Sequence, residues 1–408
     1  MRANKSEGRG KTTKKFCFRL PFSGLLPLFV LAHFSHHLVT ALTIPLLPFI
    51  RDDFALNYTQ SGFVTSAFNL PYGFSQLPAG WLADRIGPRI LITIGICGVA
   101  LAGFLIGFSQ TYVMLLAFLA LMGVLGGGYH PASPPLISAS VEAKNRGRAL
   151  GLHLIGGSAS YFLVPLIAAV IAAAWGWRGS FITLAIPTMA FGIIFYLLLG
   201  QWTNTKRTEH SVISSSEETP PTQSHWRYLA PFLVLTNFHS AVFFSIISFI
   251  PLFLVDHFGI AEETAAALVA VIFSAGLWAA PLGGYLSDRL GKVPIVLAVC
   301  FLAGPAIYLL NLAPYSLGIG GVLVLIGMII YIRMPASESY IISHTSERHR
   351  STVLGIYYFG NLEGAGVLTP IMGYLIDQLG FQLSFTIAGA TLVSVTVICA
   401  IFLRGSPD

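Results

Sequence analysis

The sequence predicts an all-α membrane protein in which twelve transmembrane helices form two pseudo-symmetric bundles of six. Of its 408 residues, 55% are hydrophobic and only 10% are charged, which is too little charged surface for a soluble protein of this size. Apolar stretches long enough to cross a bilayer as a helix recur along the whole chain. The two halves of the sequence also resemble each other at one constant offset, which indicates a duplicated bundle.

Twelve apolar stretches are expected to span the membrane. Each is continuously apolar and lacks the alternation of barrel strands, so each is interpreted as a helix. The first is too long for a cleavable signal peptide and is followed by the others. The stretches are residues 25–48, 61–83, 90–109, 112–141, 149–173, 179–200, 228–254, 264–286, 293–312, 316–344, 352–376 and 382–404.

The distribution of Lys and Arg predicts the orientation of these helices. With the N-terminus in the cytoplasm, 20 of the 23 basic residues fall in cytoplasmic segments, and only Arg51 and Arg178 lie on the outer side. Because cytoplasmic loops are enriched in basic residues, we expect both termini in the cytoplasm and a location in the plasma (inner) membrane. The net charge of +6 reflects this topology and attraction to an anionic lipid bilayer, and gives no support to nucleic-acid binding.

One polar segment separates six apolar stretches from the other six. It is rich in Ser, Thr, Glu and Pro, a composition that cannot bury a core. The predicted organisation is a basic cytoplasmic tail, a six-helix bundle, a cytoplasmic linker, a second six-helix bundle and a short C-terminal tail. These parts comprise residues 1–24, 25–200, 201–227, 228–404 and 405–408.

An internal repeat relates the two bundles. Shifting the chain by 204 residues places Asp52 on Asp256 and Gly151 on Gly355. One match between apolar helices means little, but a constant offset along most of the chain is hard to obtain by chance. Two six-helix repeats in parallel arrangement are the layout of a transporter that rocks one bundle against the other.

Two loops at equivalent positions of the repeat share one sequence pattern. They read Gly80-Trp-Leu-Ala-Asp84-Arg85-Ile-Gly87-Pro-Arg89 and Gly284-Tyr-Leu-Ser-Asp288-Arg289-Leu-Gly291-Lys292. With twelve apolar stretches, the central linker and both loops, the chain is identified as a member of the major facilitator superfamily (MFS). The resemblance covers residues 25–404 and implies the MFS fold and alternating access.

The resemblance also implies a conformational latch, because these loops stabilise the outward-facing state in that family. Gly87 permits a tight reversal with positive φ, and an aspartate can accept hydrogen bonds from a helix N-terminus. A plain tight turn with snorkelling arginines is the alternative. The expected latch residues are Gly80, Asp84, Arg85, Gly87, Arg89, Gly284, Asp288, Arg289 and Gly291.

Within the superfamily, the segment Tyr129-His130-Pro131-x-Ser133 and the later Gly156-Gly157 pair resemble the fosmidomycin-resistance type of drug efflux permease. The Gly-Pro motif typical of proton-driven drug antiporters is degenerate here, because Val164 precedes Pro165. The direction of transport is therefore left open by this motif.

Three charged residues lie inside the apolar stretches, and all are in the C-terminal half. A charge inside the bilayer is costly, so Arg333, Glu338 and Glu363 are functional candidates. Helical spacing places Ser337 and Tyr340 on the same face as Arg333. The guanidinium suits a carboxylate or phosphonate of a substrate, and a structural ion pair is the alternative. The equivalent stripe in the N-terminal half contains Tyr129 and Ser133.

Glu363 is the leading candidate for proton coupling. A carboxyl group taken out of water favours its protonated form, which suits it to proton exchange. A counter-ion role for Arg333 is the alternative, and the two roles can coexist. Glu338, five residues after Arg333 and nearer the cytoplasmic side, is the second candidate.

Histidines provide the remaining polar candidates. His33, His36 and His37 in the first stretch are interpreted as cavity-lining hydrogen-bonding groups, with proton transfer, metal binding and a structural role as alternatives, and His130 is expected to line the cavity. No Cys or carboxylate accompanies the three in the first stretch, which disfavours the metal alternative, and no metal ligand is assigned. His153 and His239 are expected to be satisfied by neighbouring groups. The expected substrate-binding residues are Arg333, Ser337, Tyr340, Tyr129, His130, Ser133, His33 and His37.

The predicted function is secondary active transport by alternating access, with proton-coupled efflux of a drug-like or metabolite anion as the leading hypothesis. Proton-coupled uptake of an organic anion is the main alternative, and a non-transporting receptor with the same fold is a remote one. The chain has no P-loop, HExxH or GxSxG motif, and because the repeat and the two loops predict a transporter, it is not expected to be an enzyme. No cofactor is expected, and the partners are a small-molecule substrate, protons and lipid, with the protein acting as a monomer.

Overall fold

The computed structural model describes residues 25–142, 145–206, 226–345 and 347–406. Within these ranges it contains helices and no strand, which confirms the all-α prediction. The expected basic tail, most of the expected linker and the last two residues lie outside the described ranges.

The N-terminal half contains seven helices among the described residues. Pro27 lies in the first turn of α1, where a missing backbone N–H does no harm. Asn57 and Gln60 form a capping box at the start of α3. The helices are α1 Leu26–Thr40, α2 Leu47–Phe54, α3 Tyr58–Ile86, α4 Pro88–Ile106, α5 Tyr112–Gly126, α6 Tyr129–Ser140 and α7 Arg146–Lys206.

The C-terminal half repeats this order with different breaks. Its described helices are α8 Trp226–Phe258, α9 Glu262–Ser274, the short 3-10 helix η2 Ala275–Leu277, α10 Ala279–Leu290, α11 Lys292–Leu310, α12 Leu317–Ser343 and α13 Glu347–Phe402. The break that divides α1 from α2 has no counterpart in α8, whereas the bend between α9 and α10 has none in α3.

Two of the helices are each long enough for two crossings of a bilayer. The apolar parts of α7 and α13 comprise 53 and 50 residues, and one crossing takes about 20. Each contains one glycine with non-helical backbone angles, Gly176 in α7 and Gly380 in α13. With α1 and α2, α5 and α6, and α9 and α10 each read as one crossing, the described helices are consistent with the predicted twelve.

The backbone itself repeats at the offset found in the sequence. Helices α4 and α11 begin and end 204 residues apart. Six of the seven described residues with positive φ also form pairs at this offset: Ala55 with Gly259, Gly87 with Gly291, and Gly176 with Gly380. The prediction that Gly87 has positive φ is confirmed, with a value of 89°.

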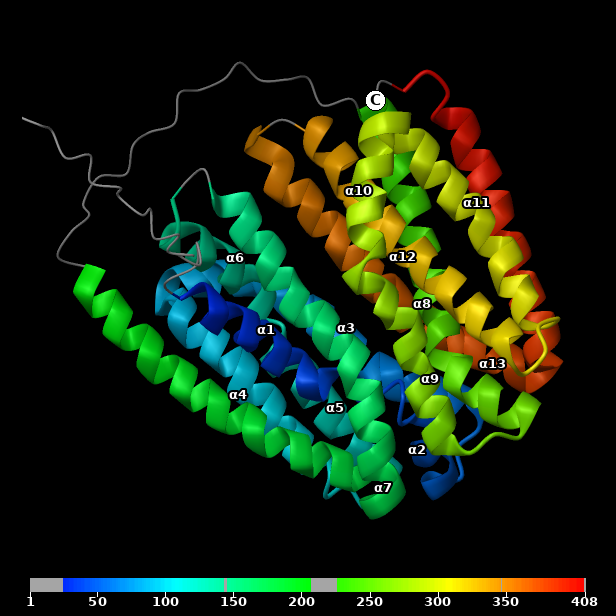
Figure 1. The fold of residues 1–408 in the computed structure, drawn as a ribbon, viewed down its shortest axis with the longest axis horizontal. Helices are drawn as coiled ribbons and strands as arrows, with labels where there is room; N and C mark the ends of the chain where they lie inside the picture. Colours follow the sequence, from blue (N-terminus) through cyan, green and yellow to red (C-terminus); the bar gives the residue numbers. More distant parts are fainter. Residues whose placement is uncertain (1–24, 143–144, 207–225, 346, 407–408) are drawn as a thin grey trace, which may run out of the picture.

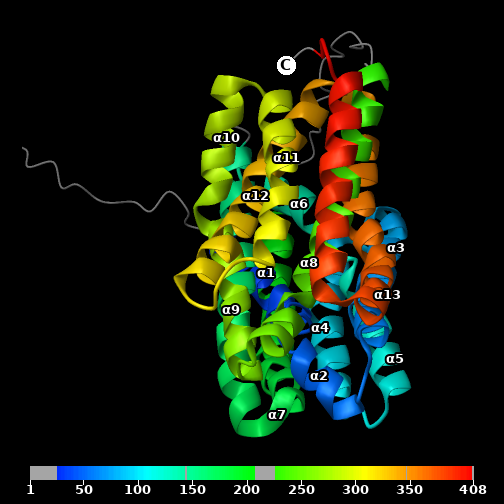
Figure 2. The ribbon, with the colours of Figure 1, turned by 90° about the vertical axis from the view of Figure 1, so that its right-hand side faces the viewer.

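The two halves lie side by side and meet along two pairs of helices. The contacts between them are made mainly by α3 with α13 and by α7 with α9. Figure 1 shows the halves converging near α2 and diverging toward the ends of α6 and α10. Figure 2 shows the long helices of both halves running along one common direction.

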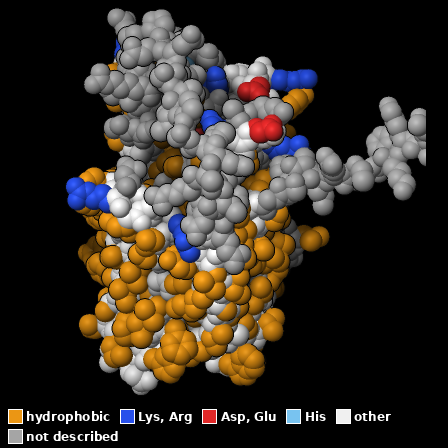
Figure 3. Space-filling view, turned by 90° about the vertical axis from the view of Figure 1, so that its left-hand side faces the viewer, with side chains coloured by type: hydrophobic (Ala, Val, Ile, Leu, Met, Phe, Trp, Pro, Cys, Tyr) orange, Lys and Arg blue, Asp and Glu red, His pale blue; other side chains and the backbone are white. Residues whose placement is uncertain are grey.

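The outer surface of the helices is apolar, as expected for a protein that contacts lipid. Val170 and Trp175 of α7 are 72% and 69% exposed. Figure 3 shows hydrophobic side chains covering most of one face, with the Lys, Arg, Asp and Glu side chains gathered toward one end. This distribution fits a belt of apolar surface around a membrane-spanning body.

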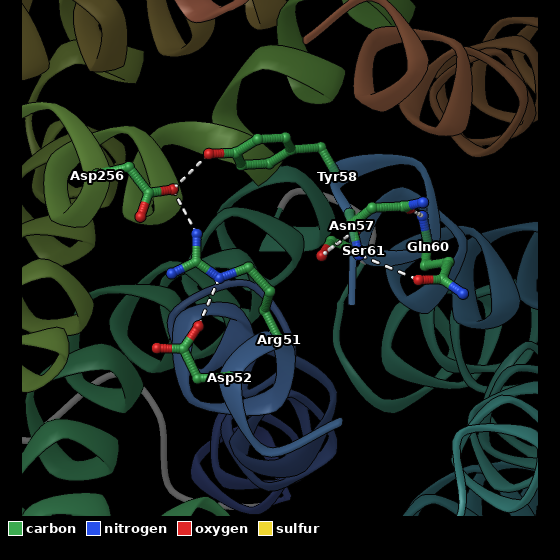
Figure 4. Close-up of polar contacts among 7 residues, drawn as sticks. All are labelled: Arg51, Asp52, Asn57, Tyr58, Gln60, Ser61 and Asp256. Carbon is green, nitrogen blue, oxygen red and sulfur yellow. Dashed lines mark hydrogen bonds and ion pairs between the residues drawn. The ribbon is translucent and has the colours of Figure 1, made fainter. Parts of the chain in front are cut away.

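Charged and polar side chains join the two halves at the end of the molecule that carries α2. Arg51 of α2 forms ion pairs with Asp256 of α8 and with its neighbour Asp52, and the phenol oxygen of Tyr58 lies 2.7 Å from a carboxylate oxygen of Asp256 (Figure 4). We call this end, marked by Arg51 and Asp256, the ion-pair end. The opposite end, marked by the loops of Gly87 and Gly291, is the motif end.

A second contact at the ion-pair end caps a helix of one half with an acid of the other. A carboxylate oxygen of Asp377, in α13, accepts hydrogen bonds from the backbone N–H of Tyr58 at 2.9 Å, and the other oxygen accepts from the N–H of Thr59 at 2.9 Å. A negative charge at a helix N-terminus is favourable. The structure is therefore closed between the halves at the ion-pair end.

Candidate functional site

The two loops that share one sequence pattern lie at the motif end and have the same backbone turn. Gly87 and Gly291 have φ of 89° and 93°, a region that favours glycine. Arg89 donates from Nε and Nη2 to the carbonyl oxygen of Tyr196, at 3.0 and 2.7 Å, and so ties α4 to α7. Arg89 thus fastens helices within the N-terminal half.

The other described latch candidates form no hydrogen bond or ion pair that joins two helices. Arg85 lies 4.1 Å above the ring of Trp81, and Arg289 lies 4.6 Å above the ring of Tyr285. Asp288 is exposed, and Gly284 faces open space. The side chain of Asp84 and the surroundings of Gly80 lie outside the described residues, so the latch stays a prediction.

Five histidines gather in the N-terminal half: His33, His36, His37, His130 and His153. His33 and His37 of α1 contact His130 of α6, with ring centres 5.2 and 5.4 Å from it. His33 also stacks on His153 of α7 at 4.3 Å. His153 donates from Nδ1 to the carbonyl oxygen of Phe29 at 3.0 Å, which confirms that neighbours satisfy it.

Tyr129 lies beside this cluster, and Ser133 follows it on α6. Tyr129 is fully buried and stacks on His36 at 4.5 Å. Ser133 is also fully buried. In the described part of the chain, neither the hydroxyl of Tyr129 nor that of Ser133 has a hydrogen-bond partner. Tyr129 is therefore brought to the histidines, and both hydroxyls have unused hydrogen-bonding capacity.

Arg333 lies in the middle of α12 and is only 4% exposed. Its guanidinium points to α8, where it donates to the carbonyl oxygen of Thr236 at 3.1 Å and to Oγ of Ser240 at 2.5 Å. Its Nε has no partner among the described residues. No carboxylate of the described residues lies within ion-pair distance of it. Its charge is therefore anchored by neutral groups and left without a counter-ion there.

His239 of α8 corrects one expectation. Both of its ring nitrogens are buried without a hydrogen-bond partner in the described ranges, so the prediction that neighbours satisfy it is wrong. Its ring stacks on Phe243 with centres 5.1 Å apart, and it interacts electrostatically with Arg333. Sequence spacing gave no signal for this pairing, because His239 and Arg333 lie on different helices.

The residues that follow Arg333 on α12 point to different neighbours. Ser337 is fully buried. Tyr340 packs against Phe232 at 4.1 Å between ring centres, and its hydroxyl lies 2.5 Å from Oγ of Ser406. Glu338 interacts with Tyr358 of α13, and its Oε1 has no hydrogen-bond partner among the described residues. Tyr340 is thus held at the motif end of the C-terminal half, away from Arg333's guanidinium contacts.

Glu363 lies in α13 at the contact between the two halves. Its side chain is buried, at 8% exposure, and packs so closely against Gly73 of α3 that a Cβ at Gly73 would overlap it. Neither carboxylate oxygen has a hydrogen-bond partner in the part of the chain described here. A ring contact at 5.5 Å between Phe74 and Phe359 continues the interface on the side of the motif end.

The structure does not bring Arg333 and Glu363 together. Arg333 is directed to α8 within its own half, whereas Glu363 faces α3 of the other half. Sequence reasoning missed Gly73, which makes room for the carboxylate. The sequence shows Gly73 only as a glycine within an apolar helix. Its role becomes apparent only when α3 is known to pack against α13, which carries Glu363.

A small cavity lies between the halves, beside the histidine cluster. Its volume is about 60 Å³. Its polar lining comes from Thr40, Thr43, Thr65 and Asn69, and Phe273 closes it from the C-terminal half. The remaining lining residues are Ala41, Ile44, Phe68 and Tyr161.

A family model described as the Major Facilitator Superfamily matches residues 29–361 and 232–408. The chain therefore belongs to this superfamily. As an MFS member it is an integral, multi-pass membrane transporter of small molecules and not an enzyme. The prediction of MFS membership, which rested on the two loops, is confirmed.

Individual relatives agree with this assignment. The chain is 25% identical over 394 residues to a probable sulfoacetate transporter of Cupriavidus necator, covering 88% of this chain and 90% of that one. It is 24% identical to the fosmidomycin resistance protein of Escherichia coli, with 89% of each chain covered. The predicted similarity to efflux permeases of that type is thus confirmed.

The fold has a close counterpart among solved structures. A bacterial homologue of the human lysosomal transporter Spinster, in an inward-facing and unoccupied conformation, superposes with a TM-score of 0.74. The match covers 93% of this chain and 95% of that one, at 18% identity. It confirms the MFS fold.

Proposed function

We propose that this transporter exports an organic anion in exchange for protons, with Glu363 carrying the proton and Arg333 holding the anion. The single observation that supports proton coupling is the carboxyl group of Glu363, which is buried between the two halves without a counter-ion or a side-chain hydrogen-bond partner among the described residues. A residue at that contact can link its protonation to the movement of the halves.

The energetic link follows from the neighbours of Glu363. A neutral carboxyl group fits the tight, apolar contact with Gly73, whereas a buried charge without a partner is strongly unfavourable. Loss of the proton therefore favours a state in which α3 and α13 separate and water reaches the carboxylate. Protonation favours the state seen here, which is closed at the ion-pair end.

Arg333 supplies the anion-binding element. Two of its donors are held by Thr236 and Ser240, so the guanidinium is positioned before a ligand arrives. Its charge has no counter-ion within ion-pair distance in the described ranges, and an anionic ligand offsets that charge. The relative named for sulfoacetate, an organic anion, supports this class of substrate.

We further propose that the motif end faces the cytoplasm, with both termini there, that the protein lies in the plasma membrane, and that it acts as a monomer. The excess of Lys and Arg in the segments at that end supports the orientation. In this orientation the structure is closed on the outer side. Asp84 and Asp288 remain the proposed latch for the opposite state, in which the motif end closes.

The similarity to the fosmidomycin resistance protein supports export over uptake. Uptake of an anion together with protons would use the same two residues. The direction in which the anion moves under a pH gradient distinguishes uptake from export.

The test uses purified protein in proteoliposomes with an imposed pH gradient. Sulfoacetate and a panel of other organic anions serve as substrates, and movement of each is measured against the gradient. Accumulation of an anion in the compartment with the lower pH would support exchange for protons, and accumulation in the compartment with the higher pH would indicate symport. No movement of any anion under either gradient, with a folded protein, would contradict the proposal.

A further inference from the structure

Three histidines of the N-terminal half place their ring nitrogens close together. One nitrogen each of His33, His37 and His130 lies within 4.8 Å of the other two. His33 and His37 come from α1 and are buried, whereas His130 comes from α6 and is partly exposed. The sequence pattern pointed to His33, His36 and His37, but the fold replaces His36 by His130.

The hydrogen bonds of His33 fix which nitrogen carries its proton. Nδ1 lies 2.9 Å from the carbonyl oxygen of His153, and a carbonyl only accepts hydrogen bonds. Nδ1 is therefore the donor in the neutral ring, and Nε2 keeps a free lone pair. An N–H to a backbone carbonyl is the support that metal-binding histidines ordinarily have.

The same reasoning applies to His37. Its Nδ1 lies 3.0 Å from Oγ1 of Thr40, and that hydroxyl donates its own hydrogen to the carbonyl oxygen of His36. With the hydroxyl hydrogen directed to that carbonyl, the hydroxyl oxygen accepts from Nδ1 of His37, and Nε2 keeps its lone pair; this is the tautomer that suits a ligand.

His36 shows what a fully satisfied ring looks like in this cluster. Its Nδ1 donates to the carbonyl oxygen of Gly95 at 3.2 Å, and its Nε2 accepts from the hydroxyl of Tyr72 at 3.0 Å. Both nitrogens are used, so His36 has none left for a ligand. His130, by contrast, forms no hydrogen bond with any described residue.

We propose that His33, His37 and His130 bind one divalent transition-metal ion of the Zn²⁺ class, with a fourth coordination position open. A nitrogen lone pair that accepts no hydrogen bond can bind a Lewis acid such as a metal ion. An anion would instead need N–H groups, which these nitrogens do not offer. Three imidazoles with an open position suit Zn²⁺, Co²⁺ or Cu²⁺. This inference is independent of the transport function proposed above.

Binding requires a modest movement and an anion. Tetrahedral coordination brings ligand nitrogens to about 3.4 Å from one another, so the rings have to rotate inward from their present separation. None of the three ligands is charged, so an anionic fourth ligand such as hydroxide or a carboxylate offsets part of the ion's charge. The partly exposed His130 gives that ligand access.

The test is a titration of tag-free, chelator-treated, full-length protein with Co²⁺, whose visible absorption reports tetrahedral coordination. We expect one Co²⁺ per chain, displaced by Zn²⁺. His130→Asn and, separately, His37→Asn should weaken binding by about tenfold or more. His257→Asn, at an exposed histidine of the ion-pair end, should leave binding unchanged.

Absence of a saturable visible band in the wild-type protein would overturn the proposal, whatever the variants do. Wild-type affinity in a folded His130→Asn variant would also overturn it. Size-exclusion profiles identify folded variants, and the wild-type spectrum decides the matter if neither variant folds.

Discussion

The two halves of this transporter share an order of helices and three turns with positive φ but differ in the chemistry of their interiors. In the N-terminal half the polar groups at the centre of the bundle are neutral side chains, among them His33, Tyr129 and Ser133. At the equivalent positions of the C-terminal half, Arg333 replaces Tyr129, and Glu363 occurs where the N-terminal half has Ala159. One half thus offers lone pairs and hydroxyls, and the other offers charges.

The difference shows what the repeat does and does not determine. Turns at Gly87 and Gly291, and at Gly176 and Gly380, are the same in both halves because each needs a positive φ. The charged residues need no such backbone, so they could arise in one half alone. The repeat therefore sets the frame, and departures from it place the functional groups.

The largest expected effect comes from removing the ionisable carboxyl group at the contact between the halves. Glu363→Gln should abolish pH-driven anion accumulation while downhill exchange continues, because the amide keeps the shape of the neutral acid but cannot release a proton. Accumulation and exchange are measured in the same proteoliposomes. Glu263→Gln, at an exposed acid of the ion-pair end, serves as the control. Wild-type accumulation by Glu363→Gln would remove it as the coupling residue.

A smaller effect is expected at the charge of the C-terminal half. Arg333→Lys keeps the charge but loses the planar fork of donors, so affinity for the anion should fall by about tenfold, or about 1.4 kcal/mol. Arg404→Lys, at an exposed position, is the matched control. Binding is followed by the anion-dependent rise in thermal stability. Unchanged affinity would assign Arg333 a structural role.

The smallest difference between the two halves is expected at the two equivalent turns, where the same substitution should have nearly the same effect on stability. Gly87→Ala and Gly291→Ala should each destabilise the protein by about 1–3 kcal/mol, because alanine is strained at their φ of 89° and 93°. Gly151→Ala and Gly355→Ala lie in helices with open space at Cβ, so they should be neutral or slightly stabilising. Thermal unfolding of all four variants checks this. A large difference between Gly87→Ala and Gly291→Ala would contradict the equivalence of the two turns.

Much of the fold could be predicted from the sequence because apolar length, basic residues and the repeat are properties of the chain alone. The positive φ of Gly87 is one example, since the turn is local. The contacts of the candidate site were harder to predict because they depend on which helices pack together. Gly73 against Glu363, and Arg333 against Thr236 of α8, join segments that the sequence leaves unconnected.

The histidines illustrate the same limit within one half. The spacing of His33, His36 and His37 suggested one polar face, but Tyr72 and Gly95 take up both nitrogens of His36. His130 enters the cluster from α6 instead. No pattern in α1 alone distinguishes these outcomes, because the partners come from α3, α4 and α6.

The link between Glu363 and the movement of the halves is tested most directly by a distance across the ion-pair end. Spin labels at Gln110→Cys and Glu263→Cys, both exposed there, would be measured between acidic and alkaline pH after replacing the four native cysteines. We expect the short distance of the closed state at acidic pH, a longer distance at alkaline pH, and the short distance at both in Glu363→Gln. A pH-dependent distance that survives in Glu363→Gln would contradict the link.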